Sequence, residues 1–392
     1  MTYTQIEKRR VARWKSATTV LPAAAKAPAP YVNKQGSADG PAHDFCVPAE
    51  HATLSLLPEV RVAALALFAE LGIPWHAGVG GGPSNHLLSS QVQCVNALGQ
   101  MVWDPTRIAR AFGGVMDVGE VLPIEPGRYL TFEYVGPTDF FDESPTGPRI
   151  RGAHCTSVDA AFLHQAGDGV LELVLVEWKY TEYYRVRAPD AAKDAVRLGR
   201  YGAALADPSG PVRGDLLAFK FLLDEPFYQL MRQQLLAHAL EVSGAEGASR
   251  VRLVHVLSPD NHEYQLSLAR PEHRALGGTV DEVWSQLLRR PGRFAKLDSA
   301  VFLDPEITSR EYSLRHADDV VYGLPELLAH LDMTEPDGLE DTLDVEADLL
   351  VTTTGLELVA GRVGHVLDYP FRLTELYEVI EEIEQQWEAD LP

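Results

Sequence analysis

Cysteine is scarce in this chain, which has only Cys46, Cys94 and Cys155 among its 392 residues. An odd number of cysteines does not fit a disulfide framework, and no two of them have the Cys-x-x-Cys spacing of a thiolate zinc site. The sequence therefore argues against both kinds of site. A reducing cytoplasm is the expected location.

Long apolar runs are also missing. No stretch approaches the roughly 20 apolar residues that cross a membrane. The basic residues between Lys8 and Lys15 are followed only by the run 20–25, which contains Pro22 and is too short for the core of a signal peptide. We therefore expect a soluble protein that is not exported and has no membrane partner.

Positive charge is in short supply, with 34 Lys and Arg against 56 Asp and Glu and a net charge of -22. Such a balance is unusual for a protein that contacts the phosphates of nucleic acid. The acidity is concentrated, however, because residues 331–392 hold 17 acidic residues against Arg362 and Arg372. Residues 1–34 hold seven Lys or Arg and only Glu7. The uneven distribution leaves nucleic-acid binding open.

Composition divides the chain into three parts. Residues 1–50 are expected to begin with a short basic helix and to continue as an Ala- and Pro-rich arm, whose basic charge either touches phosphates or belongs to a solvated and partly disordered leader. Residues 51–270 carry the periodic apolar patterns of an α/β domain. Residues 271–392 are expected to be an acidic and mainly helical C-terminal region, with helix candidates at 283–288, 324–331 and 371–387.

Hydrophobic periodicity and turn residues predict an ordered run of elements in the middle of the chain. They are a helix at 89–101, a strand at 128–135, strands at 158–163 and 170–180, a helix at 227–240 and a strand at 252–257. Ser89 or Ser90 is expected to cap the first helix. The two middle strands, separated by a Gly-containing loop, are expected to form a hairpin.

Three polar residues of this hairpin are the main candidates for chemistry. Side chains alternate along a strand, so Glu177 and Lys179 are expected on one face, while Val176 and Trp178 pack on the other. With the turn centred near residue 167, Asp159 is expected opposite residue 175 and diagonal to Glu177, at roughly 5 to 8 Å. The carboxylates of Asp159 and Glu177 and the amine of Lys179 would then lie close together at one end of the hairpin.

Other polar residues lie on the neighbouring elements. Glu133 of the preceding strand either faces the same place or is an exposed strand glutamate, and Gln91 either joins the site or only binds nearby backbone. Gln229, Arg232, Gln233 and Leu236 follow one stripe of the helix at 227–240. That stripe either meets phosphate oxygens or is a solvated helix edge.

Together these residues suit phosphodiester cleavage. The reaction needs a hard cation such as Mg²⁺, which prefers carboxylate oxygens and water, and Asp159 and Glu177 would supply those oxygens. Lys179 would orient or help to deprotonate the attacking water and balance charge in the transition state. An Asp with a Glu-x-Lys also arises by chance, and a strand-end ion pair of Glu177 with Lys179 is the competing interpretation.

The order of elements and several short phrases resemble the PD-(D/E)XK nuclease superfamily, and within it a group of bacterial proteins described as restriction endonuclease-like. The similar phrases cover roughly residues 85–260. They are Ser89-Ser90-Gln91 with Asn96, Phe132-Glu133-Tyr134, Ser157-Val158-Asp159, Glu177-Trp178-Lys179-Tyr180-Thr181-Glu182 and Tyr228-Gln229-Leu230-Met231-Arg232.

The resemblance implies a restriction-endonuclease-like α/β core, a mixed central sheet flanked by helices in the order αβββαβ. It also implies that Asp159 and Glu177 bind metal and that Lys179 is catalytic. Supporting roles are implied for Glu133, Gln91, Gln229 and Arg232.

Two positions depart from the pattern. Val158 stands where the motif has proline, and Gln91 stands where many relatives place a glutamate. The second departure weakens the case for a second metal ion, and Glu133 is the expected compensation.

The sequence therefore predicts a Mg²⁺-dependent endonuclease, with Mn²⁺ as a substitute ion, that acts in restriction or defence against foreign DNA. DNA is the expected nucleic-acid partner, RNA stays open, and a homodimer is possible. The alternative is a catalytically inactive nucleic-acid- or protein-binding module on the same fold.

Overall fold

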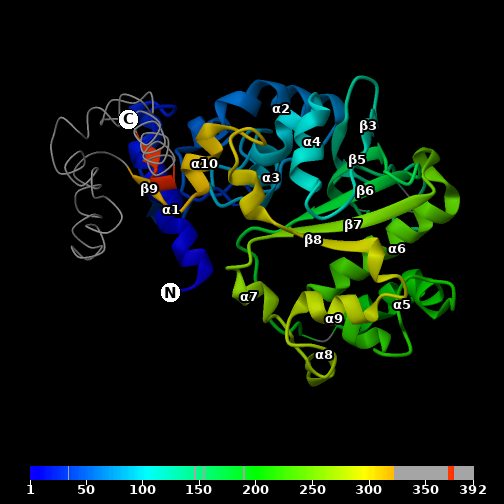
Figure 1. Ribbon diagram of the computed structural model, residues 1–392. Coiled ribbons are helices and arrows are strands. Elements are labelled where there is room, and N and C mark those ends of the chain that lie inside the picture. The colour runs from blue at the N-terminus through cyan, green and yellow to red at the C-terminus, as the bar shows by residue number, and fades with distance from the viewer. Residues whose placement is uncertain (34, 145–146, 153–154, 189, 322–369, 375–392) are drawn as a thin grey trace, which may run out of the picture.

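A six-stranded mixed sheet forms the centre of the computed structural model, which describes all residues except 34, 145–146, 153–154, 189, 322–369 and 375–392 (Figure 1). The strand order is β3-β5-β6-β7-β8, and β4 also pairs with β5. Pairing is antiparallel up to β6 and parallel from β6 to β8. The bounds are β3 Glu120–Leu122, β4 Leu130–Tyr134, β5 Val158–Gln165, β6 Leu171–Trp178, β7 Arg250–Leu257 and β8 Phe294–Asp298.

Helices cover both faces of this sheet, so the molecule has three layers (Figure 1). One face packs against α2, α3, α4 and α10, and the other against α5, α6 and α9. Their bounds are α2 Pro58–Leu71, α3 Ser90–Leu98, α4 Pro105–Phe112, α10 Arg310–His316, α5 Ala191–Ala206, α6 Phe227–Ser243 and α9 Val280–Leu287. The short helices α7 His262–Gln265 and α8 Pro271–Arg274 connect β7 to α9.

The central strands are apolar on both sides because alternate residues join different cores. Val174 and Val176 of β6 pack in the core with α2, α3 and α4. Leu173 and Leu175 pack in the core with α6 and α9. This burial on both faces explains why β6 has a continuous apolar run rather than strict alternation.

The expected element order is confirmed. Helix α3, strands β4, β5 and β6, helix α6 and strand β7 follow one another in the order αβββαβ. Ser89 is the N-cap of α3, and its side chain accepts a hydrogen bond from the backbone N–H of Val92. Gly244 ends α6 in the left-handed conformation, with φ of 64°.

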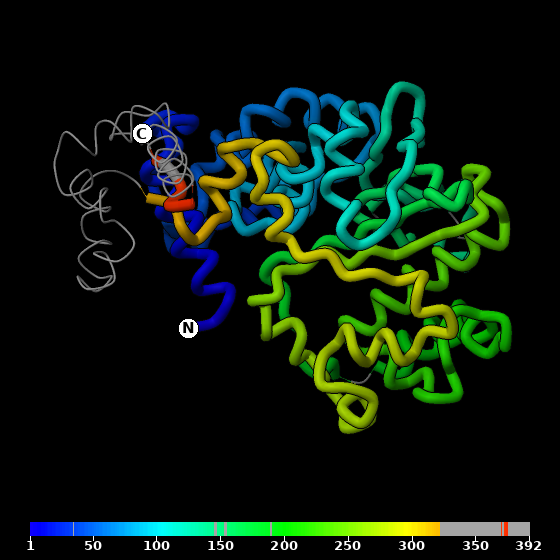
Figure 2. Tube along the Cα trace, in the orientation of Figure 1, coloured from blue at the N-terminus to red at the C-terminus, as the bar shows by residue number. Residues whose placement is uncertain are grey.

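The N-terminal part begins with the expected helix, but this helix is packed against the rest of the protein rather than solvated. Residues Tyr3–Ala17 form helix α1, which lies beside α10 (Figure 2). Trp14 is fully buried, and its Nε1–H donates to Oε1 of Glu311 in α10 at 2.6 Å. Lys15 is buried too and donates to backbone carbonyl oxygens, one of them that of Cys46 at 2.8 Å. The apolar side of α1 is buried against the protein, even though the helix as a whole is rich in basic residues.

The part after residue 270 contributes to the central sheet, which the sequence did not reveal. β8 pairs with β7 in parallel, and the chain then returns to the first layer as α10 (Figure 2). Of the expected helices, 283–288 corresponds to α9, and 324–331 lies outside the described residues. The start of the third, Phe371–Arg372, is instead strand β10, which pairs with β9 at Val320–Val321, and residues 375–387 lie outside the described part.

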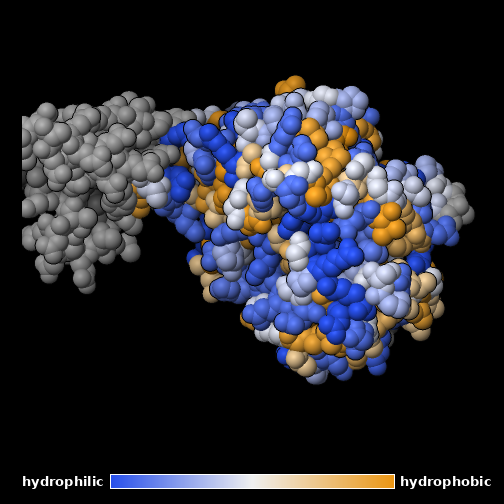
Figure 3. Space-filling model, turned by 45° about the vertical axis from the view of Figure 1, so that its right-hand side comes forward, coloured by the Kyte–Doolittle hydropathy of each residue, from blue (hydrophilic) through white to orange (hydrophobic). Residues whose placement is uncertain are grey.

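Apolar residues on one face of the molecule and in the described helices bear on membrane association. On the face in Figure 3, hydrophilic residues form a broad band and hydrophobic residues form separate patches. Within the described ranges, no single helix is long and apolar enough to cross a membrane. Ala49–Ser55 and α2 meet that test only jointly, as a pair bent by 105°.

Candidate active site

Strands β5 and β6 place Asp159 and Glu177 at the same end of the sheet. The observed register pairs Ala160 with Val176, and continuing it by one residue puts Asp159 opposite Glu177. The backbone N–H of Trp178 donates to Oδ2 of Asp159 at 2.6 Å, which fits this placement. The two carboxylates are therefore direct cross-strand neighbours.

The expected register was wrong by two residues. Ala166 donates to the carbonyl of Val170, and Gly169, with φ of 78°, completes a three-residue loop at 167–169. A glycine in the left-handed region at the third loop position is a common hairpin closure. It centres the turn one residue later than expected. A shift by two residues keeps every side chain on its predicted face.

Lys179 follows β6 directly and forms an ion pair with Glu177. Its Nζ lies 2.6 Å from Oε1 of Glu177, and the two side chains are 6% and 2% exposed. The backbone N–H of Lys179 donates to the carbonyl of Val256 at 2.9 Å, which extends the parallel pairing with β7. The ammonium is thus held at the carboxyl end of a buried parallel strand.

Helix α6 supplies the amide partners of this pair. Nζ of Lys179 donates to Oε1 of Gln229 at 2.7 Å, and Nε2 of Gln233 donates to Oε2 of Glu177. Gln229 and Gln233 are four residues apart and lie on one side of the helix. The sequence singled out both amides, but for contact with phosphate, and it did not predict their contacts with Lys179 and Glu177.

Glu133 belongs to the same neighbourhood and is not an exposed strand residue. It is 5% exposed, and its carboxylate accepts from Nε2 of Gln91 at 3.2 Å and from Oγ of Ser157 at 3.0 Å. Gln91 also binds backbone, because its Oε1 accepts from the N–H of His76 at 2.8 Å. Gln91 therefore contacts Glu133 as well as nearby backbone and does not bind backbone alone.

The backbone of Glu133 is unusual for a strand. Its φ is 48°, in the left-handed region that non-glycine residues rarely adopt, and it interrupts the pairing of β4 with β5. Such a conformation costs on the order of 1–3 kcal/mol and is often found at functional sites. Here it accompanies a buried carboxylate turned toward Gln91 and Ser157.

Arg232 has partners within the protein. Its Nε–H donates to Oγ1 of Thr156 at 3.0 Å, and its Nη2 lies 3.5 Å from Oε1 of Glu143. Glu143 also accepts from the backbone N–H of Thr156 at 2.5 Å and from the hydroxyl of Tyr201. Arg232 thus ties α6 to the segment that enters β5. Glu143 was not expected from the sequence.

Negative charge predominates among these groups. Burial and the neighbouring Glu177 and Glu133 carboxylates raise the pKa of Asp159, and burial raises the pKa of Glu133. Burial is the largest single effect and lowers the pKa of Lys179, but Glu177, Tyr184, Glu182 and Tyr264 together outweigh it, so the pKa lies above its usual value. Burial and the same three carboxylates raise the pKa of Cys94 in α3. One ammonium therefore faces three carboxyl groups.

The described residues contain no ready group of three or more His, Cys, Asp or Glu side chains in metal-holding positions. Both oxygens of Glu177 accept hydrogen bonds, from Lys179 and Gln233. On Asp159, Oδ2 is bonded to the Trp178 N–H, whereas Oδ1 has no hydrogen-bond partner among the described residues. Oδ1 is therefore the oxygen that is free to bind a cation.

Comparison with known proteins gives one result. The model of a protein family described as restriction endonuclease associating with ARP (REase-ARP) matches residues 13–318. No curated protein and no solved structure matches the chain. The matched residues include the whole central sheet, helix α6 and each of the candidate site residues.

Proposed function

Because the chain belongs to the REase-ARP family of restriction endonucleases, we propose that it is a Mg²⁺-dependent DNA endonuclease of the PD-(D/E)XK type that restricts foreign DNA. The observation that supports this most is the meeting of Asp159, Glu177 and Lys179 at one end of the β5–β6 hairpin. A double-strand cut would require two such sites, as a homodimer provides.

The donor set suits a hard divalent cation. The ion would be held by Asp159, Glu177 and Glu133, whose three carboxyl groups outnumber the one ammonium of Lys179, and its binding would displace hydrogen bonds that now engage both oxygens of Glu177. When bound, Mg²⁺ would offset the charge of the scissile phosphate and make water a better nucleophile. Gln91 has no charge to contribute and acts by fixing the Glu133 carboxylate.

The chain's own residues position the reacting groups. Lys179 is held between Glu177 and Gln229, so its ammonium has a fixed place from which to stabilise charge that develops on the phosphate. Gln233 fixes the second oxygen of Glu177. Arg232, with Thr156 and Glu143, keeps the entry to β5 and therefore Asp159 in place.

DNA would reach this site along helix α5. Segment 185–200 carries five basic residues against two aspartates, in a chain of net charge -22. The guanidinium of Arg197 in α5 lies 4.2 Å from the ring of Tyr228, which directly precedes Gln229. The basic segment therefore flanks the candidate active site, and its charge is complementary to a phosphate backbone.

Metal dependence provides the first test. We expect the purified protein to cut duplex DNA with Mg²⁺ or Mn²⁺ and to lose all cutting when EDTA removes the ion, because the carboxylates alone would repel the phosphate. Gel assays on defined duplex, single-stranded DNA and RNA substrates measure this. If no nucleic acid is cut with any divalent ion, the nuclease proposal fails and an inactive binding module on the same fold replaces it.

Charge reversal in α5 provides a second test. We expect Lys193→Glu to weaken duplex binding and to reduce the slope of log K against log salt by about 0.9, the value for one lost phosphate contact. Lys193 is 73% exposed and pairs with Asp190 at 3.2 Å. Fluorescence anisotropy in EDTA, over a range of salt concentrations, measures both quantities without cleavage.

Lys296→Glu is the matched control for that substitution. Lys296 is 61% exposed and also has one aspartate partner, Asp281 at 4.0 Å, but it lies on β8. We expect its binding and salt slope to equal those of the parent. If both substitutions weakened duplex binding equally, only the net charge of the protein would affect binding. Helix α5 would then not be part of the DNA-binding surface.

A further inference from the structure

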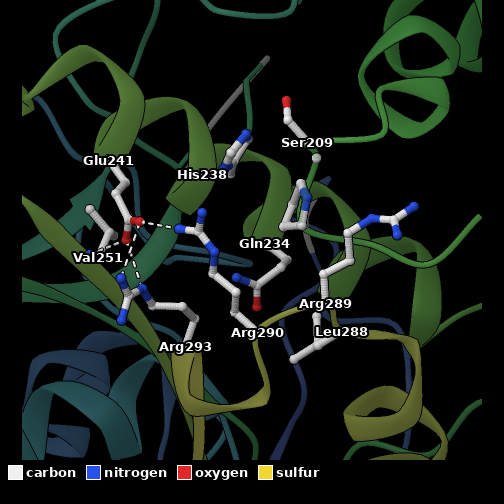
Figure 4. Close-up of a pocket in the computed structure, with 11 residues that line it drawn as sticks. Ser209, Gln234, His238, Glu241, Val251, Leu288, Arg289, Arg290 and Arg293 are labelled. Atoms are coloured by element: carbon white, nitrogen blue, oxygen red, sulfur yellow. Dashed lines mark hydrogen bonds and ion pairs between the residues drawn. The ribbon is translucent and has the colours of Figure 1, made fainter.

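A pocket lined by arginines lies away from the candidate active site, between the C-terminal half of α6, the start of β7 and the segment after α9 (Figure 4). Val251 of β7 lines it, whereas Lys179 pairs with Val256 at the other end of that strand. Five residues of strand span roughly 17 Å. The polar residues of the pocket are Gln234, His238, Glu241, Arg289, Arg290 and Arg293.

Positive charge exceeds negative charge in this pocket. Arg290 and Arg293 both pair with Glu241, at 2.9 and 2.8 Å, and point toward it in Figure 4. Arg289 lies 3.7 Å from Asp215, outside the pocket, and also interacts electrostatically with Asp207. Three guanidinium groups thus share one lining carboxylate, in a chain that is strongly acidic overall.

Gln234 gives independent evidence that the pocket binds a ligand. Its side chain is 2% exposed and lies between Arg289 and Arg290 (Figure 4). Its Oε1 is buried without a hydrogen-bond partner among the described residues. Buried polar groups are almost always hydrogen-bonded, so an unpaired buried amide oxygen in the lining of a pocket indicates a missing ligand.

We propose that this pocket binds a phosphoryl group, either a phosphate of a nucleic-acid backbone or that of a free nucleotide. Guanidinium groups donate paired hydrogen bonds to phosphate oxygens, and the Gln234 amide adds a neutral donor beside them. Its amide oxygen accepts from a protonated phosphate oxygen or a ligand hydroxyl. Burial lowers the pKa of His238, which is neutral at pH 7 and adds one N–H donor.

Titration calorimetry with inorganic phosphate at constant ionic strength tests the proposal. We expect the parent to bind phosphate and both Arg290→Ala and Gln234→Leu to bind it at least about tenfold more weakly. The matched control is Arg110→Ala, because Arg110 is 53% exposed and pairs with Glu306, as Arg290 is 64% exposed and pairs with Glu241. The control is expected to bind phosphate as the parent does.

Competition identifies the source of the phosphoryl group. Displacement of phosphate by AMP, with duplex binding in EDTA unchanged by Arg290→Ala, assigns the pocket to a free nucleotide. Displacement by a duplex, together with weaker duplex binding of Arg290→Ala, assigns it to nucleic acid. Absence of phosphate binding by the parent, or equal binding by the parent, Arg290→Ala and Gln234→Leu, overturns the proposal.

The result does not depend on the proposed nuclease activity. Asp159 lies at the other end of the central strands, and Asp159→Asn is expected to leave phosphate binding unchanged. Gln234→Leu is also informative about stability, because it removes an unpaired buried amide at nearly constant volume. A purely structural Gln234 predicts a change in melting temperature with no change in phosphate affinity, and this pattern would likewise overturn the proposal.

Discussion

A Lys179→Met variant is expected to lose DNA cleavage by at least about 100-fold, the usual effect of removing one group that stabilises charge in a transition state. The reason is geometric, since the Lys179 ammonium is held at 2.6 Å from Glu177 and 2.7 Å from Gln229 at the end of β6. Single-turnover cleavage with Mg²⁺ measures the loss. Lys296→Met, an exposed lysine on β8, serves as the matched control and is expected to cut like the parent.

The same substitution is expected to destabilise the fold, which could by itself reduce cleavage. Glu177 is 2% exposed, and removing its cationic partner leaves a buried carboxylate at a cost of roughly 3–5 kcal/mol. The double variant Glu177→Gln/Lys179→Met removes both charges together and is expected to recover most of that stability. Its melting temperature should therefore approach that of the parent.

Cleavage by the double variant separates a catalytic pair from a structural one. If Glu177 and Lys179 only form an ion pair at a strand end, activity returns when stability returns. If they carry the chemistry, the double variant folds and does not cut. The second outcome is our prediction, and recovery of cutting would contradict the site assignment.

The faces of the hairpin were predictable because side-chain alternation is a local property. Glu177 and Lys179 lie together on the α6 side, and Trp178 packs against the opposite layer, as their spacing indicated. The register was less secure, because it depends on which loop residue takes the left-handed conformation. Gly169 takes it, and the sequence Gly167-Asp168-Gly169 offers two candidates.

Contacts between distant segments were the main source of error. β8 joins the sheet by parallel pairing with β7 across an intervening helical segment, and no local pattern marks Phe294–Asp298 as its partner. The packing of helix α1 was not expected, because basic residues surround Val11 and Trp14, which are both fully buried. Composition describes a whole segment, whereas packing depends on one side of it.

The contacts among polar side chains also could not be predicted from residue spacing alone. Gln229 and Gln233 occupy the same stripe of α6, yet one accepts from Lys179 and the other donates to Glu177. The positive φ of Glu133 could not be predicted from the sequence, because the residue is neither a glycine nor an asparagine. Its buried contact with Gln91 becomes visible only when β4 and α3 are placed next to each other.

An Asp159→Asn variant is expected to show the opposite combination of effects, with cleavage lost by at least about 100-fold and the metal-free protein slightly stabilised. The substituted amide keeps an oxygen that can accept from the Trp178 N–H, so the local hydrogen bond survives. The change removes a carboxyl group whose pKa is raised by burial and by the neighbouring Glu177 and Glu133 carboxylates. We expect a rise in melting temperature on the order of 2 °C at pH 7.

The sign of this stability effect depends on pH in a defined way. A carboxyl group whose pKa is higher in the folded than in the unfolded chain makes the folded state bind more protons, so its ionisation destabilises the fold as pH rises. The advantage of Asp159→Asn is therefore present at pH 7 and shrinks as the pH falls toward the ordinary pKa of an aspartate, about 4. Melting curves of parent and variant in EDTA at several pH values measure it.

Added Mg²⁺ is expected to reverse the order of the two proteins. An ion that binds only the folded state stabilises it by RT ln(1 + [L]/Kd), about 2.7 kcal/mol at a concentration 100 times Kd. The parent should gain this stability because Asp159 offers Oδ1 to the ion, and Asp159→Asn should gain little. Equal Mg²⁺ shifts in the parent and the variant would contradict Asp159 as a metal ligand, whatever the cleavage assay shows.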